Sequence, residues 1–188
     1  MHFPHTVIHW TLAASATAAV IFFAAGLNGY FEAPVERRPW LRSLHFTTRV
    51  LSLLHLAGVV FLPPRSDFWA GAGISLYCAA VAIHLSSIEA ARRTRLQRAF
   101  VDAPLPDRLI TDGPYRWVRH PFYVGYILGG LAAPVAVDSL GLVAIALMMV
   151  VLTVSAAIRE ERVWLASPRG DEYRAYQRRT AMFIPFVH

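Results

Sequence analysis

The 188-residue sequence contains no lysine and a single cysteine, Cys78, and only 16% of its residues are charged. One cysteine excludes a fold held together by intrachain disulfides. Soluble domains have about 25% charged residues and roughly 45–50% hydrophobic ones, whereas 56% of this sequence is hydrophobic. A soluble fold of this size could not bury that much apolar surface. The composition therefore excludes a soluble globular enzyme or a disordered chain and indicates a membrane protein.

Apolar runs that suit a bilayer occur five times along the chain. A membrane-spanning helix needs roughly 20 apolar residues. The sequence predicts an all-α, polytopic protein with one membrane domain and about five transmembrane helices. We expect these spans at about 7–27, 44–62, 68–88, 121–137 and 140–158. The two residues between the last two spans are too few for anything but a turn, so these spans should form a hairpin.

Arginine carries all of the Lys+Arg charge behind the net charge of +6, and it is distributed unevenly between the spans. Arg65 is the only arginine expected on one side of the membrane, whereas segments 89–120 and 159–188 carry most of the others. By the positive-inside tendency, the arginine-rich side and the C-terminus should be cytoplasmic and the N-terminus opposite. Orientation explains this charge better than nucleic-acid binding does, because the arginines form no continuous stripe, and no nucleic-acid partner is expected.

The tail from residue 159 onward is amphipathic and has a rim of two tyrosines and two phenylalanines. Such a rim is typical of the aromatic belt at a membrane–water interface. We therefore expect these four side chains at the interface: Tyr173, Tyr176, Phe183 and Phe186.

The entrance to the fourth span is the first candidate binding site. Pro121 suits the first position of a helix, and the residue before a proline is disfavoured in the α region, which places His120 at the helix mouth. A helix N-terminus offers unpaired N–H groups that suit a carboxylate or a phosphate. Tyr115 and Tyr123 would add aromatic faces and hydroxyls. The alternative is a simple juxtamembrane anchor.

Two adjacent acids, Glu160 and Glu161, follow the last span and form the second candidate site. Neighbouring positions on a helix point about 100° apart, so one acid can face inward while the other meets arginine or solvent. An inward glutamate could bind an ammonium group or ribose hydroxyls. The alternative is a solvated charge run with local arginine pairing.

The histidines of the apolar spans do not indicate a metal site. His9, His45, His55 and His84 are too far apart from one another for the i, i+3 or i, i+4 spacing of a helical ligand pair, and no cysteines accompany them. We interpret them as helix-packing or pore-lining polar residues and predict no metal.

Four motifs follow one another in the C-terminal half of the chain. They are GPYRWVRHPFYVG at 113–125, the pair Glu160-Glu161, GDEYRAY at 170–176 and FIP at 183–185. In this order they resemble the signature of the isoprenylcysteine carboxyl methyltransferase and phospholipid methyltransferase group of membrane enzymes. The resemblance covers about residues 109–185 well and the first three spans only by layout.

The resemblance implies an enzyme that uses S-adenosylmethionine on the cytoplasmic side and methylates a lipophilic small molecule that enters from the bilayer among membrane lipids. One of the two adjacent acids should complete the cofactor site, and both remain candidates. The residues that the resemblance assigns to the cofactor are Asp107, Arg108, Leu109, Ile110, Tyr115, His120, Pro121, Phe122, Tyr123 and Glu160 or Glu161.

The acceptor is left open by the sequence. Carboxylate O-methylation is favoured, ahead of phospholipid amine N-methylation and thiol S-methylation. The arginine that carboxyl-methylating relatives direct at their substrate falls at Ala156 or Ala157, so Arg159 is the candidate substrate residue. An acceptor that must lose a proton would need a base, for which His120 or Glu161 is the nearest candidate. The alternative function is a non-catalytic membrane protein that retains the scaffold, such as an assembly or transport factor.

Overall fold

The computed structural model describes residues 7–29, 31–32, 39–92, 96–97 and 108–187. The long helices are α1 (Val7–Gly29), α2 (Pro39–Phe61), α3 (Asp67–Ala91), α4 (Pro121–Ala136) and α5 (Leu140–Leu165). Shorter elements are the 3₁₀ helix η1 (Gly113–Arg116), α6 (Gly170–Gln177) and strands β1 (Phe31–Glu32) and β2 (Leu96–Gln97), which pair in parallel. The predicted all-α class is confirmed, with a helix for each of the five apolar runs.

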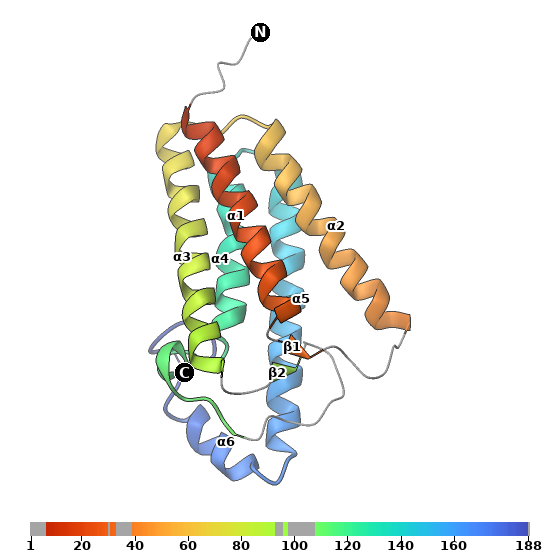
Figure 1. Cartoon of the computed structure of the whole chain (residues 1–188), viewed down its shortest axis with the longest axis vertical. Coiled ribbons are helices and arrows are strands. Elements are labelled where there is room, and N and C mark those ends of the chain that lie inside the picture. The colour runs from red at the N-terminus through yellow and green to blue at the C-terminus, as the bar shows by residue number, and fades with distance from the viewer. Residues whose placement is uncertain (1–6, 30, 33–38, 93–95, 98–107, 188) are drawn as a thin grey trace.

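The five long helices form a bundle in which α3 and α4 lie side by side, with α1 across them (Figure 1). Helix α2 joins the others at its C-terminal end and diverges from them toward its N-terminal end. The short helix α6 lies next to the C-terminal end of α5. The candidate site residues discussed below gather at this α6 end of the bundle.

Three helices within the described residues are long and apolar enough to cross a membrane: Val7–Ala25, Asp67–Ala91 and Leu140–Leu165. The described part of α2, Phe46–Phe61, and helix α4 are shorter apolar helices. Large apolar side chains also cover the outside of the bundle, such as Phe46, which is 69% exposed, and Leu147, which is 60% exposed. A bilayer is the environment in which such a surface is stable, and this supports the prediction of a membrane protein.

The predicted hairpin is present as helices α4 and α5. Ser139 caps α5 by accepting a hydrogen bond from the backbone N–H of Leu142 at 3.4 Å. The predicted span ended at residue 158, but α5 continues to Leu165. Glu160 and Glu161 therefore lie on this helix, beyond the predicted span.

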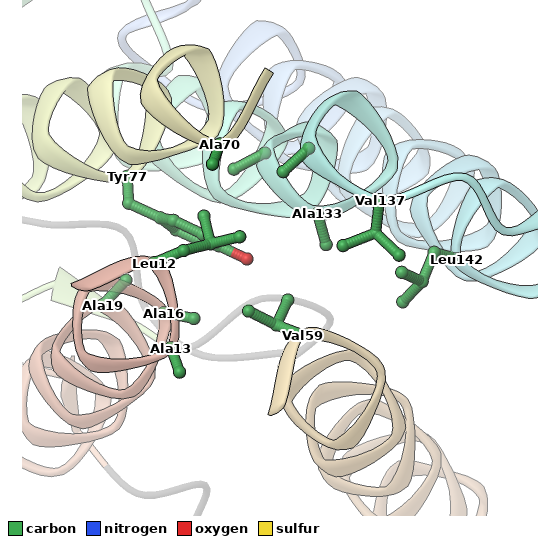
Figure 2. Packing of buried hydrophobic residues seen from close by; sticks show 12 residues of the cluster. Leu12, Ala13, Ala16, Ala19, Val59, Ala70, Tyr77, Ala133, Val137 and Leu142 are labelled. Carbon is green, nitrogen blue, oxygen red and sulfur yellow. The ribbon is translucent and has the colours of Figure 1, made fainter. Parts of the chain in front are cut away.

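The apolar core lies at the end of the bundle opposite α6, where all five long helices meet (Figure 2). Small residues let the backbones approach each other: a Cβ at Gly73 would lie 2.8 Å from the Cβ of Ala136 and 3.0 Å from the carbonyl oxygen of Ala132. Val59 of α2 and Leu142 of α5 close this core from the other side. The members of this cluster include Leu12, Ala16, Val59, Ala70, Tyr77, Ala133, Val137 and Leu142.

Three of the four histidines singled out above pack between helices. His9 Nε2 lies 3.1 Å from the carbonyl oxygen of Val59, which links α1 to α2. His55 Nε2 lies 2.7 Å from the Tyr77 hydroxyl, which links α2 to α3. His84 is fully buried. These contacts support the helix-packing interpretation, and the side chain of His45 lies outside the described part of the chain.

Candidate functional site

The entrance of α4 is built as the sequence predicts. The helix η1 begins at Gly113, whose φ of 58° favours glycine because a side chain there would be strained. The chain then enters α4 at Pro121, with His120 at the N-cap position. A proline at the first helical position sacrifices no hydrogen bond, since that N–H has no partner inside the helix. This geometry brings a buried imidazole to the N-terminus of α4.

The C-terminal segment folds back against this entrance. Val118 and Ala181 form an isolated parallel bridge. The backbone N–H of Arg119 donates to the carbonyl oxygen of Ala181 at 2.8 Å, and that of His120 donates to the carbonyl oxygen of Met182 at 3.3 Å. Residues that are about 60 positions apart in sequence thus form one wall of the site.

Glu161 lies at the centre of a saturated hydrogen-bond network. Its Oε1 accepts from Arg119 Nε at 2.7 Å and lies 3.0 Å from His120 Nε2. Its Oε2 accepts from Gln177 Nε2 at 2.7 Å and from Arg119 Nη2 at 3.3 Å. The side chain is only 11% exposed. Because the fork of Arg119 engages both oxygens, Glu161 is an ionised carboxylate whose acceptor sites are already used.

Glu160 has a different environment, although it is the next residue on α5. Its Oε1 accepts a hydrogen bond from the Tyr123 hydroxyl, and its Oε2 lies 3.7 Å from His120 Nδ1. The side chain is 36% exposed, compared with 11% for Glu161. Of the two acids, Glu160 is the more exposed, although partial burial raises the pKa of its carboxyl.

The imidazole of His120 lies between the two acids, and the network fixes its tautomer. A carboxylate only accepts hydrogen bonds, so the contact with Glu161 requires a proton on Nε2. In the neutral imidazole, Nδ1 then carries the lone pair and faces Glu160. The ring of Tyr123 stacks on the imidazole, with centroids 5.5 Å apart and an interplanar angle of 17°. The arrangement places Nδ1 of the imidazole beside the more exposed of the two acids.

The tyrosines of η1 and α6 connect these elements behind the site. The Tyr176 hydroxyl donates to the carbonyl oxygen of Tyr115 at 2.6 Å. Burial raises the pKa of both phenols above the ordinary value, so that both stay protonated. The predicted aromatic rim is therefore wrong for Tyr173 and Tyr176, which are each 3% exposed because α6 packs them inward, whereas Phe186 is 78% exposed.

The structure brings most of the predicted cofactor residues together. Ile110 packs in one buried cluster with Tyr115 and Phe122. The others at this entrance are His120, Pro121, Tyr123, Glu160 and Glu161.

Three further predicted residues are not part of this group of contacts, and a fourth lies outside the described part of the chain. Leu109 is partly buried, and Arg108 is exposed. Arg159, the candidate substrate residue, is partly exposed on α5. Asp107 falls outside the described residues.

Sequence reasoning missed Arg119, Gln177 and Thr180. Arg119 stands inside the motif at 113–125 and was passed over because arginine is common throughout this chain. Gln177 and Thr180 follow the motif at 170–176, and only the folding back of the tail brings them to the site. No local pattern signals that contact.

Comparison with known proteins identifies the family. A family model described as phospholipid methyltransferase matches residues 69–168, just over half of the chain. The chain belongs to the phospholipid methyltransferase family. The matched region contains most of α3 together with β2, η1, α4 and α5, and it ends before α6. The resemblance noted from the motifs is thereby confirmed.

The similar proteins have names that describe different functions. The chain is 40% identical over 77 residues to cobalt-zinc-cadmium resistance protein CzcN of Cupriavidus metallidurans, covering 41% of this chain and 35% of the relative. It is 40% identical over 81 residues to methanethiol S-methyltransferase 1 of Bradyrhizobium diazoefficiens, covering 43% and 27%. It is 26% identical over 182 residues to protein-S-isoprenylcysteine O-methyltransferase B of Arabidopsis thaliana, covering 90% and 91%. The first two matches thus span only about a third of the relatives' length.

Proposed function

We propose that this protein is an integral membrane methyltransferase that uses S-adenosylmethionine to methylate a lipophilic small molecule. One observation carries the proposal: an accessible acid, Glu160, lies beside His120 and Tyr123 at the N-terminus of α4. The family membership supports it, since the relatives include proteins named as methyltransferases of a thiol and of an isoprenylcysteine.

The residues present fit this cofactor. S-adenosylmethionine carries a carboxylate, an ammonium group, a sulfonium and ribose hydroxyls. The N-terminus of α4 suits the carboxylate, Glu160 suits the ammonium group or the ribose, and the tyrosine faces suit the adenine or the sulfonium. Glu161 has no acceptor capacity left, because it accepts from Arg119, His120 and Gln177. Glu160 is therefore our choice between the two acids.

The cofactor supplies the methyl group, and the chain contributes alignment and the exclusion of water. His120 is the candidate base for an acceptor that must lose a proton, because its Nδ1 is not engaged by Glu161 and lies on the side of the more exposed acid. Glu161 orients this imidazole through Nε2. We accordingly replace the expected catalytic role of Glu161 with a role in holding His120.

The acceptor is proposed by class. A carboxylate remains the first candidate, followed by a phospholipid amine and a thiol. Ala156 and Ala157 are buried, at 2% and 0% exposure, and provide no cation for a carboxylate. Arg159 is the arginine on α5 that could do so.

We further propose five membrane spans, with the α6 end of the bundle in the cytoplasm. Arginines concentrate at this end, for example Arg119, Arg162 and Arg174, whereas Arg65 pairs with Asp138 at the opposite end. The positive-inside tendency places the first group in the cytoplasm. A polar cofactor would then approach from the cytosol and a lipophilic acceptor from the bilayer.

The test is to incubate membranes that contain the protein with methyl-labelled S-adenosylmethionine, extract the lipids and treat the product with base. Label released as methanol identifies an ester, and retained label identifies nitrogen, sulfur or ether oxygen. A Glu160→Gln variant is the control for background enzymes. If the purified protein does not bind the cofactor and no label is incorporated, the proposal is wrong and the non-catalytic alternative is favoured.

A further inference from the structure

Arg119 contacts two separate segments of the chain at once, the end of α5 and residues 177–181. Its Nε and Nη2 donate to Glu161 of α5, at 2.7 and 3.3 Å. Its Nη1 donates to the carbonyl oxygen of Thr180 and, at 3.4 Å, to that of Gln177. Its backbone N–H donates to Ala181. We call Arg119, Glu161 and residues 177–182 the tail clamp.

The ion pair at the centre of the tail clamp is buried, and its polar groups are paired. The side chains of Arg119 and Glu161 are each 11% exposed. A buried ion pair is stable only when further hydrogen bonds satisfy its remaining donors and acceptors, and the removal of one partner leaves an uncompensated charge. Here Gln177 and the carbonyl oxygens of the tail supply those bonds. The exposed pair Arg174–Asp171 on α6 lies in solvent and is worth little by comparison.

The tail clamp also determines how His120 is presented. The same Oε1 of Glu161 that accepts from Arg119 lies 3.0 Å from His120 Nε2. The backbone N–H of His120 donates to Met182, and the ring of Phe183 lies 5.9 Å from the imidazole. A shift of the tail would therefore move the imidazole and release Glu161 from its partners.

We propose that Arg119 and Gln177 are positioning residues. They fasten residues 177–182 to the entrance of α4, hold the imidazole of His120 in a single orientation and keep Glu161 away from ligands. Glu160 is thereby the one acid of the pair that is presented to the methyl donor. This inference rests on the proposed function where it concerns the donor, and on the structure alone where it concerns the tail.

Substitutions of Gln177 give the sharpest test. Gln177→Glu places a carboxylate against Glu161, and Gln177→Met removes one hydrogen bond at nearly constant volume. Misplacement of reacting groups by about 1 Å can cost on the order of 100-fold in rate. We expect Gln177→Glu to weaken S-adenosylmethionine binding at least about tenfold, with a smaller loss for Gln177→Met and little change in the KM for the acceptor.

Arg119→Lys and Arg119→Met distinguish the contribution of the positive charge from that of the planar guanidinium group. Lysine keeps the charge but cannot bridge both oxygens of Glu161 and the tail carbonyls. We expect Arg119→Lys to rescue part of the donor affinity lost in Arg119→Met. Arg174→Ala is the matched control on α6, because it removes an exposed ion pair and should leave donor binding unchanged.

Hydrogen exchange of the intact protein in lipid nanodiscs tests the tail without the donor. Loss of the tail clamp should accelerate exchange of the Arg119 and His120 amides, which donate to Ala181 and Met182, while amides in the middle of α3 stay protected. If wild-type protein fails to bind S-adenosylmethionine, the proposed function is wrong. The exchange measurement still tests whether Arg119 and Gln177 hold residues 177–182 against the entrance of α4.

Normal donor affinity together with unchanged exchange in Gln177→Glu and Arg119→Lys would overturn the inference. If Gln177→Glu does not fold, Gln177→Met carries the test, since it adds no charge. A uniform loss of amide protection across α3 in Gln177→Met would also overturn the inference, because such a loss would indicate that Gln177 contributes to the stability of the whole bundle.

Discussion

His120 Nε2 lies 3.0 Å from Glu161 Oε1, although 41 positions separate the two residues in sequence. This contact joins the entrance of α4 to the end of α5. The two adjacent acids therefore have different environments: Glu161 holds the imidazole, whereas Glu160 stays partly exposed. The two adjacent glutamates should consequently respond differently to the same substitution.

Glu160→Gln should abolish donor binding and leave the fold intact, because this acid makes few contacts inside the protein. Glu161→Gln should lower the free energy of unfolding by about 3 kcal/mol, since it leaves Arg119 buried without a counter-charge. Cofactor titration and thermal unfolding in detergent distinguish the two outcomes. Equal effects of both variants on both measurements would contradict this division of roles.

Tyr123→Phe removes the hydroxyl that donates to Glu160 but keeps the ring that stacks on His120. A hydrogen bond of this kind contributes about 0.5–1.5 kcal/mol, so donor affinity should fall between about twofold and tenfold. Tyr123→Ala removes the stacking ring as well and should weaken binding further. The comparison of these two dissociation constants checks the prediction, and identical values would exclude a role for the stacked ring.

Tyr77→Phe should destabilise the bundle without changing donor affinity. The Tyr77 hydroxyl lies 2.7 Å from His55 Nε2 and fastens α2 to α3 far from the site. An unpaired buried polar group costs about 1–3 kcal/mol, and His55 would be left in that state. Ser75→Ala is the control, because it removes an exposed hydroxyl from the same helix. Thermal unfolding of the two variants should differ clearly.

Gly73→Ala and Gly130→Ala test the close packing of α3 and α4. A Cβ at Gly73 would lie 2.8 Å from the Cβ of Ala136, whereas one at Gly130 would meet only ordinary contacts from 3.7 Å onward. Overpacking costs about 1–3 kcal/mol, so the first substitution should lower thermal stability and the second should not. A similar stability of both variants would show that the helices can separate at no cost.

The proposed orientation can be checked by labelling. In a Cys78→Ala background, a thiol introduced by Arg169→Cys should react with an impermeant reagent from the cytoplasmic side. One introduced by Asp138→Cys should react from the other side, since both positions are exposed at opposite ends of α5. Labelling of both thiols from the same side would contradict the five-span arrangement.

The sequence indicates the helices and the entrance of α4 because their signals are local. An apolar run, a short turn at 138–139 and Pro121 after His120 each act on their immediate neighbours. Hydropathy marks where apolar residues stop, so the predicted span ends at residue 158 while the helix itself continues through Glu160 and Glu161 to Leu165.

The folding back of the tail could not be read from the sequence, because its contacts join distant residues. Tyr173 and Tyr176 have the amphipathic character of an interfacial rim, yet α6 buries both of them. The choice between the two acids likewise needed the positions of Arg119 and Gln177. Long-range pairing and not composition determines which carboxylate is accessible.

The parallel bridge between Val118 and Ala181 has a consequence for biosynthesis. The helices that contribute His120 and Glu160 emerge from the ribosome before the segment that braces them. A nascent chain can therefore complete its bundle while the entrance of α4 still lacks one wall. The wall is finished only when residues 177–182 have been translated, so synthesis of this segment determines when the site is complete.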